Sequence, residues 1–172
     1  MSSILGKKIF LGLSITVPFL IYCIYYYGNM IKNAPFKFTE FESITLRYGI
    51  GDSLVNDYNS KTKVYHYLNS RDSLITTMVK LNKDDLLYLH RKAVQLGFWD
   101  YPEDLRADTN VRQPMAVTYY LEFRYKRKSK KLVFDEDYAG NPKLHDAAVA
   151  LIGEVKKTIN DAEDRQNAQK IK

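Results

Sequence analysis

A run of uncharged residues near the N-terminus constrains this chain more than any other feature. Residues 9–27 read IFLGLSITVPFLIYCIYYY, nineteen positions without a charge. An α-helix of that length spans about 28 Å, close to the ~30 Å hydrocarbon core of a bilayer. Two lysines precede the run, and three consecutive tyrosines end it, where amphipathic rings favour the headgroup layer. The run therefore predicts a transmembrane helix over residues 9–28.

Three fates of this segment are open, and we favour an uncleaved signal anchor. A cleaved signal peptide has a shorter apolar region followed by small residues at the cleavage site, whereas this run is long and ends in tyrosines. A lipoprotein would carry its lipid on Cys23, but Tyr22 stands where that motif has a small residue. Lys7, Lys8 and the terminal amine precede the helix, against Lys32 and Lys37 after it, and this slight bias in positive charge favours residues 1–8 in the cytoplasm and the main domain in the periplasm or outside the cell.

The rest of the composition limits the classes of partner. The 172 residues suggest one domain with appendages. The net charge is +6, and +4 without Lys7 and Lys8, which is well short of a dedicated nucleic-acid binder. A single cysteine excludes an intrachain disulfide and a cysteine-based metal cluster. We therefore expect no nucleic-acid partner and no cofactor.

Beyond a linker over residues 29–40, the pattern predicts a folded domain over residues 41–160. Apolar residues alternate with polar ones in several stretches, which is typical of half-buried strands. A polar loop is expected over residues 49–62 and an irregular segment over residues 100–114. The expected strands are residues 43–49, 63–68, 73–81, 115–125 and 130–136.

Two helices are expected among these strands. Asn82 is a suitable N-cap with two aspartates in the first turn, and Gly97 can end that helix in the left-handed conformation. Asn141 followed by Pro142 is a specific start for the second helix, and a flexible tail is expected over residues 161–172. The order β-β-β-α-β-β-α predicts an α+β fold, in which an antiparallel sheet of about five strands carries two helices packed on one face.

Four segments in this order carry a resemblance to a known family. They are VYHYLNSRDSLITTMVKL, LNKDDLLYLHRKAVQLGFW, VTYYLEFRYKRKSKKLVF and NPKLHDAAVALI. Over residues 43–159 the chain resembles a family of small uncharacterised bacterial envelope domains, often carried by lipoproteins. The resemblance implies this fold and an envelope location, and it implies no catalytic residues.

The residue types that usually carry catalysis are scattered along the sequence. His66, His90 and His145 fall in different expected elements, and none has a second ligand at metal-binding spacing. The acidic pair at residues 84–85 is explained by helix capping, and we assign the acidic run at residues 135–137 to charge balance against the neighbouring lysines. No catalytic, cofactor-binding or metal-binding residue is therefore assigned.

A basic cluster between the last two expected strands is the one candidate contact site. Its charges can keep a hairpin turn solvated and discourage edge pairing, contact anionic lipid headgroups, or bind an acidic protein partner. Its members are Arg124, Lys126, Arg127, Lys128, Lys130 and Lys131.

The function expected from these features is that of a membrane-tethered envelope domain that binds a partner and is not an enzyme. The lipid bilayer is the first expected partner, through residues 9–28, and an envelope protein or anionic surface is the second. Two alternatives stay open, an inhibitor or immunity-type protein and an enzyme with an unrecognised site.

Overall fold

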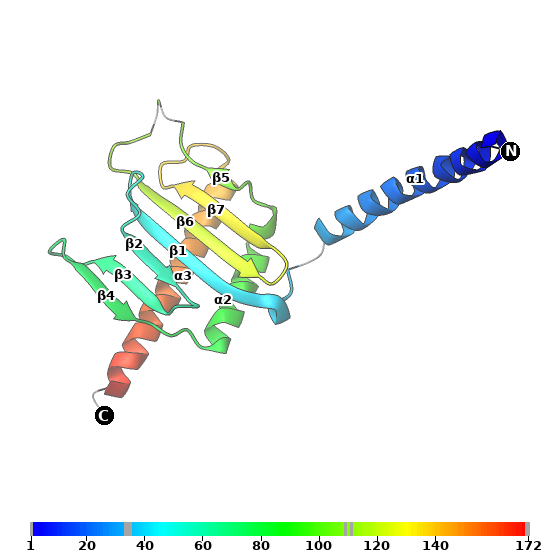
Figure 1. Cartoon of the computed structure of the whole chain (residues 1–172). Helices are drawn as coiled ribbons and strands as arrows, with labels where there is room; N and C mark the ends of the chain where they lie inside the picture. The colour runs from blue at the N-terminus through cyan, green and yellow to red at the C-terminus, as the bar shows by residue number, and fades with distance from the viewer. Residues whose placement is uncertain (1, 33–35, 109, 111, 171–172) are drawn as a thin grey trace. The chain divides into compact units, whose positions relative to one another are not determined.

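The chain divides into two compact units, Met1–Phe36 and Lys37–Lys172, shown as a ribbon in Figure 1. The computed structural model describes residues 2–32, 36–108, 110 and 112–170, without the side chains of residues 2–5 and 28–32. Each unit is described by itself.

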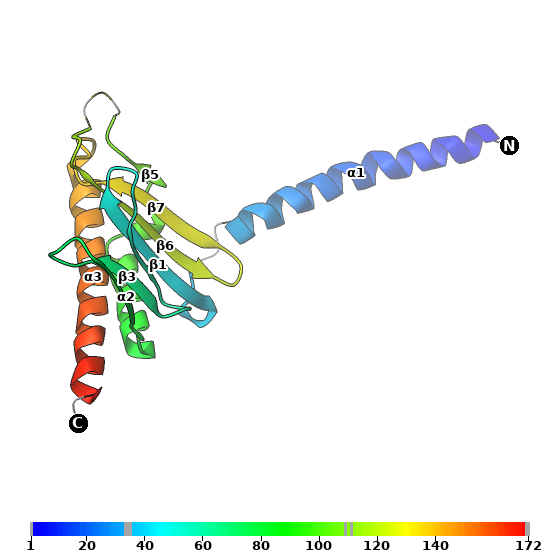
Figure 2. The same ribbon diagram turned by 60° about the vertical axis from the view of Figure 1, so that its left-hand side comes forward.

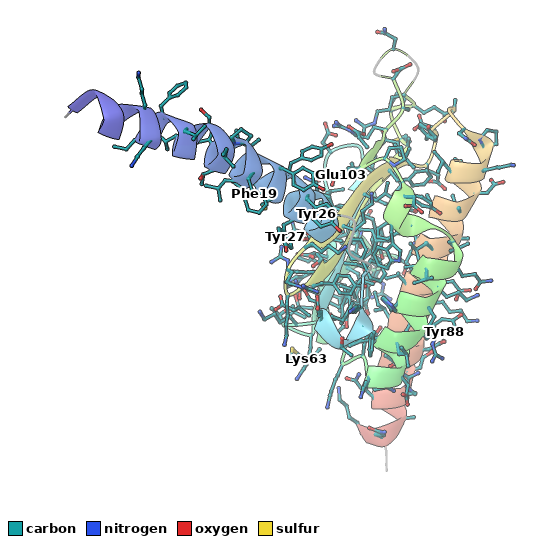
Figure 3. All side chains as sticks on the ribbon, turned by 90° about the vertical axis from the view of Figure 1, so that its right-hand side faces the viewer. Phe19, Tyr26, Tyr27, Lys63, Tyr88 and Glu103 are labelled. Atoms are coloured by element: carbon teal, nitrogen blue, oxygen red, sulfur yellow. The ribbon has the colours of Figure 1, made fainter. Side chains whose placement is uncertain are left out.

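The first unit is a single helix, α1 (Ser2–Lys32), with Pro18 inside it. Its stretch Gly6–Tyr27 has a mean hydropathy of 1.9, is long and apolar enough to cross a membrane, and has no buried residue in its most apolar window. Phe19 is 63% exposed and its ring projects from the helix (Figure 3). The predicted apolar helix is confirmed. It is longer than expected at both ends, since it includes most of residues 1–8 and the first part of the expected linker, of which residues 33–35 lie outside the described residues.

The second unit is a seven-stranded sheet with two helices, in the strand order β4-β3-β2-β1-β6-β7-β5 (Figure 1). All neighbouring strands are antiparallel except β5 and β7, which are parallel. The strands are β1 (Phe41–Ile50), β2 (Asn56–Asn59), β3 (Val64–Leu68), β4 (Leu74–Met78), β5 (Asp104–Leu105), β6 (Val117–Tyr125) and β7 (Ser129–Asp135).

The core lies between one face of this sheet and the helices. Ile44 pairs with Phe123 and Leu46 pairs with Leu121, and all four side chains have no exposed surface. Successive residues of a strand point to opposite faces, so the alternation seen in the sequence becomes one apolar face and one polar face. Figure 2 shows both helices on the same side of the sheet.

Helix α2 (Lys83–Gln95) begins and ends at the predicted residues. The side chain of Asn82 accepts a hydrogen bond from the backbone of Asp85, and the Asp85 carboxylate accepts one from the backbone of Asn82. This capping box satisfies two backbone donors that the helix would otherwise leave free. Gly97 has a φ of 73°, a left-handed conformation that costs glycine nothing.

Two strands were missing from the prediction, so the expected five-stranded antiparallel sheet is only roughly matched. Strand β2 lies inside the expected loop over residues 49–62, and only Tyr58 of its four residues is buried. Strand β5 lies inside the expected irregular segment and has two residues. A short polar strand has no alternation of apolar and polar residues that the sequence could reveal. It forms because neighbouring strands offer it hydrogen-bond partners.

Helix α3 (Pro142–Lys170) starts as predicted but continues where the flexible tail was expected, up to the last two residues, which lie outside the described part of the chain. Its extension is held by the rest of the unit. Ala162 is fully buried, Arg165 lies 2.6 Å from the carboxylate of Asp85, and Gln166 donates to the carbonyl of Lys80. These partners lie far away in the sequence, which is why the local pattern did not reveal them.

Candidate functional site

The predicted basic cluster lies at the turn between β6 and β7, beside the start of the second unit. The backbone N–H of Lys126 donates to the carbonyl of Glu40, at a distance of 2.9 Å. Glu40 ends a short 3₁₀ helix, Phe38–Glu40, that leads directly into β1. The cluster is therefore next to the segment through which the domain continues from α1.

Three of the six basic side chains are paired with carboxylates inside the domain. Arg127 makes two hydrogen bonds to Glu40, of 3.0 and 2.6 Å, and this pairing holds the pKa of Glu40 below its ordinary value. Arg124 lies 3.0 Å from Glu122, and Lys131 lies 3.4 Å from Glu103. All three basic side chains are more than half exposed, so solvent screens these pairs and they add little to stability.

The other three basic residues differ in their surroundings. The ammonium of Lys130 donates to the carbonyl of Tyr101, and partial burial lowers the pKa of Lys130. The pKa of Lys128 is lowered mainly by desolvation and, to a smaller extent, by repulsion from Arg127. Lys126 is exposed. Three of the six basic side chains are therefore paired with carboxylates, so the cluster is not a bare basic patch.

A buried ion pair lies at the opposite end of β6 and β7. Thr118 and Asp135 are paired residues of these strands, and the Thr118 hydroxyl donates to Asp135 Oδ1 at 2.6 Å. The Nε of Arg112 lies 3.2 Å from Asp135 Oδ2, and the backbone of Ala107 donates to the same oxygen. Asp135 has no exposed surface.

This arrangement corrects the role expected for the acidic run over residues 135–137. The charge of Asp135 is balanced by Arg112, while three members of the basic cluster pair with Glu40, Glu103 and Glu122. Because both oxygens of Asp135 accept hydrogen bonds, its carboxylate is suited to holding the loop of Arg112 against the sheet. Reasoning from sequence missed this pair, since no spacing pattern joins residue 112 to residue 135 before the strand register is known.

An apolar hollow lies near that end of the sheet. It has a volume of about 380 Å³. Ile50, Val55 and Leu68 in its wall are 49%, 39% and 39% exposed. Its lining residues are Tyr48, Gly49, Ile50, Ser53, Val55, Asn56, Leu68 and Val117. Its lining has no charged side chain, and its polar side chains are those of Tyr48, Ser53 and Asn56.

The three histidines remain apart, in β3, α2 and α3. His66 Nδ1 lies 2.9 Å from the hydroxyl of Thr76, and His90 Nδ1 lies 2.7 Å from the hydroxyl of Tyr125. His145 Nε2 lies 3.1 Å from the carbonyl of Glu136. Within the described residues, no group of three or more His, Cys, Asp or Glu side chains could hold a metal ion.

Comparison with known proteins adds no family to these observations. No protein-family model, no curated protein and no solved structure matches the chain.

Proposed function

We propose that this chain is a membrane-tethered envelope protein whose folded domain is a non-catalytic binding module. The observation that carries the proposal is the stretch Gly6–Tyr27, a helix of mean hydropathy 1.9 with none of its most apolar window buried. Exposed apolar surface costs about 25 cal/mol per Å² in water, and a bilayer removes that cost. The resemblance to small bacterial envelope domains is part of the same proposal.

The short connection between the units supports a role close to the membrane surface. Helix α1 ends at Lys32 and the second unit starts at Lys37. A fully extended chain covers at most ~3.6 Å per residue, so these five steps reach about 18 Å. The basic cluster adjoins Glu40, so its side chains are within reach of the headgroups of the bilayer that holds α1.

Lipid contact by the cluster supplements the anchor and does not replace it. Each basic residue near an anionic surface contributes about 1 kcal/mol, and the attraction fades within a Debye length. Because half of its side chains are already paired with carboxylates, the cluster supplies at most a few kcal/mol, ~1 kcal/mol for each basic residue that reaches the surface. That is enough to orient a tethered domain and too little to hold a free one.

The binding module is preferred to an enzyme because of how the polar groups are arranged. Both oxygens of the buried Asp135 are occupied, and the three histidines contact neighbours in separate elements. An inhibitor or immunity-type role is a special case of a binding module, and protection of cells from a co-encoded toxin would single it out.

Fractionation of cells that express the full chain tests the tether. The protein is expected in the membrane pellet after alkaline carbonate extraction. A fusion of alkaline phosphatase to its C-terminus is expected to be active, and a fusion of green fluorescent protein to its C-terminus is expected not to fluoresce. An N-terminal tag that stays on the protein excludes cleavage, and retention of Cys23→Ser in the membrane excludes lipidation as the anchor. Full-length protein in the soluble fraction without detergent would refute the proposal.

A matched pair of substitutions tests the lipid contact. The full chain is placed in nanodiscs of zwitterionic lipid or of a zwitterionic–anionic mixture, and hydrogen exchange at residues 126–130 is compared. Anionic lipid is expected to slow exchange there, and Lys126→Glu with Lys128→Glu is expected to remove the difference. Lys61→Glu, an exposed change elsewhere in the domain, should leave it intact. Equal exchange in both lipids would exclude headgroup contact while leaving the anchor standing.

A further inference from the structure

Strand β4 (Leu74–Met78) is an edge of the sheet that lacks the usual protection. Its sequence, LITTM, has no charge, proline or glycine, and consists mostly of residues that favour strands. Leu74 and Met78 are 60% and 59% exposed. Edge strands in native proteins are normally short, charged, interrupted or covered, because an open edge pairs with other chains. The opposite edge, β5, has only two residues.

The hydrogen bonds of the β3–β4 hairpin show which backbone groups of β4 are free. Asn69 donates to the carbonyl of Ser73, and Val79 donates to the carbonyl of Lys63. In an antiparallel pair, every second residue points its N–H and C=O toward the partner strand. Residues 73, 75, 77 and 79 therefore face β3, and Leu74, Thr76 and Met78 direct their backbone groups outward. Among the described residues, no hydrogen bond to these outward groups is found.

We propose that β4 pairs antiparallel with β4 of a second copy of this chain, with the two-fold axis at Thr76. In this register Leu74 lies opposite Met78 of the other copy, and the outward backbone groups of both strands meet. The pairing forms six main-chain hydrogen bonds and joins the two sheets into one. The interface is self-complementary, as a two-fold axis requires.

Charge selects this register over its neighbours. With Thr76 on the axis, Asp72 in the turn before β4 (φ 52°) and Lys80 of the other copy, just after its β4, come to the same end of the strand pair. Both residues are exposed. A shift by one residue would set outward backbone groups against inward ones. A shift by two residues would place Asp72 opposite Met78, or Lys80 opposite Leu74. Opposite charges on facing positions stabilise an antiparallel pair, and a charge facing an apolar side chain does not.

Disulfide trapping tests the pairing and its register. In a Cys23→Ser background, Thr76→Cys places two cysteines on the axis, about 5.5 Å apart between Cα atoms, within the range that a disulfide bridges. Leu74→Cys alone places them about 14 Å apart, beyond that range. The full chain, in cell membranes and in detergent, is expected to give an oxidant-dependent dimer for Thr76→Cys. Leu74→Cys should stay monomeric, and Leu74→Cys combined with Met78→Cys should cross-link again.

A second variant separates loss of pairing from loss of folding. The N–H of residue 76 points outward, so Thr76→Pro removes no hydrogen bond between β4 and β3. The variant is expected to keep its circular dichroism spectrum and to sediment as a monomer in detergent, where the wild type sediments as a dimer. A monomeric wild type would overturn the proposal, as would equal cross-linking of Thr76→Cys and Leu74→Cys. Cross-linking of Thr76→Cys to a different protein would assign the edge to another partner. None of these outcomes bears on whether α1 anchors the chain.

Discussion

Replacing Arg112 with methionine is expected to lower the free energy of unfolding of the second unit by about 3–5 kcal/mol. The substitution leaves the Asp135 carboxylate, which has no exposed surface, without its positive partner. Asp135 keeps the hydrogen bonds from Thr118 and Ala107, so the loss belongs near the lower end of that range. Methionine has an apolar stem of comparable length, which limits the contribution of a cavity.

Unfolding of the full chain by urea, in detergent and followed by the fluorescence of Trp99, measures this loss. Trp99 is the only tryptophan and its ring packs against Phe98 and Phe123, so its emission reports on the core. For a unit of this size, 3–5 kcal/mol corresponds to a decrease in Tm of about 10–20 °C.

The matched control removes an exposed arginine from strand β1. Arg47 lies 3.4 Å from Asp57, and both side chains are more than one third exposed. Arg47→Met should therefore cost no more than about 1 kcal/mol. Adding Asp135→Asn to Arg112→Met should recover part of the loss, because it removes the unpaired charge. Equal losses for Arg112→Met and Arg47→Met, or no recovery with Asp135→Asn, would refute the reasoning.

Three further predictions concern features that hold the domain together. Burial is the larger cause and the charge of Arg91 the smaller cause of a lowered pKa of His90. As the pH falls below the ordinary value of 6.5, the unfolded chain therefore takes up a proton at this histidine before the folded domain does, and the folded domain loses stability. The Tm of His90→Gln should therefore fall less than the Tm of the wild type between pH 7 and pH 5. Parallel curves of Tm against pH for the two proteins would contradict this. Deleting residues 161–172 removes the buried Ala162 and should cost about 1–3 kcal/mol in urea unfolding, whereas a flexible tail would cost nothing. Asn82→Ala should cost about 0.5–2 kcal/mol and Asn82→Gly only a few tenths, and equal losses would exclude capping as the cause.

Much of the local structure could be predicted because short-range physics determines it. Asn82 and Gly97 bound α2 as expected, because capping and a left-handed residue act within one helical turn. The alternation in β1 and β6 marked the face that packs into the core, where Ile44, Leu46, Leu121 and Phe123 have no exposed surface, although Thr45 and Glu122 on the other face are buried as well. The sequence also predicted that the six basic residues lie at one turn, because it predicted the strands β6 and β7 on either side of that turn.

The partners of those residues could not be predicted in the same way. Glu40 pairs with Arg127 across 87 positions, and only the placement of the 3₁₀ helix beside the β6–β7 turn brings them together. The buried contact of Arg112 with Asp135 likewise depends on where a loop folds over the sheet. Neither ion pair leaves a trace in the residues adjacent to it in the sequence.

The amino-acid sequence by itself determined the apolar first helix, the two capped helices and the strands with an alternating pattern, because each of these depends on residues within a few positions of one another. Only the tertiary structure decided that NDYN becomes β2, that α3 continues to Lys170, and that β4 is left at an open edge. These features depend on which segments become neighbours in space. Register and long-range packing set those contacts, and no short stretch of the chain encodes them alone.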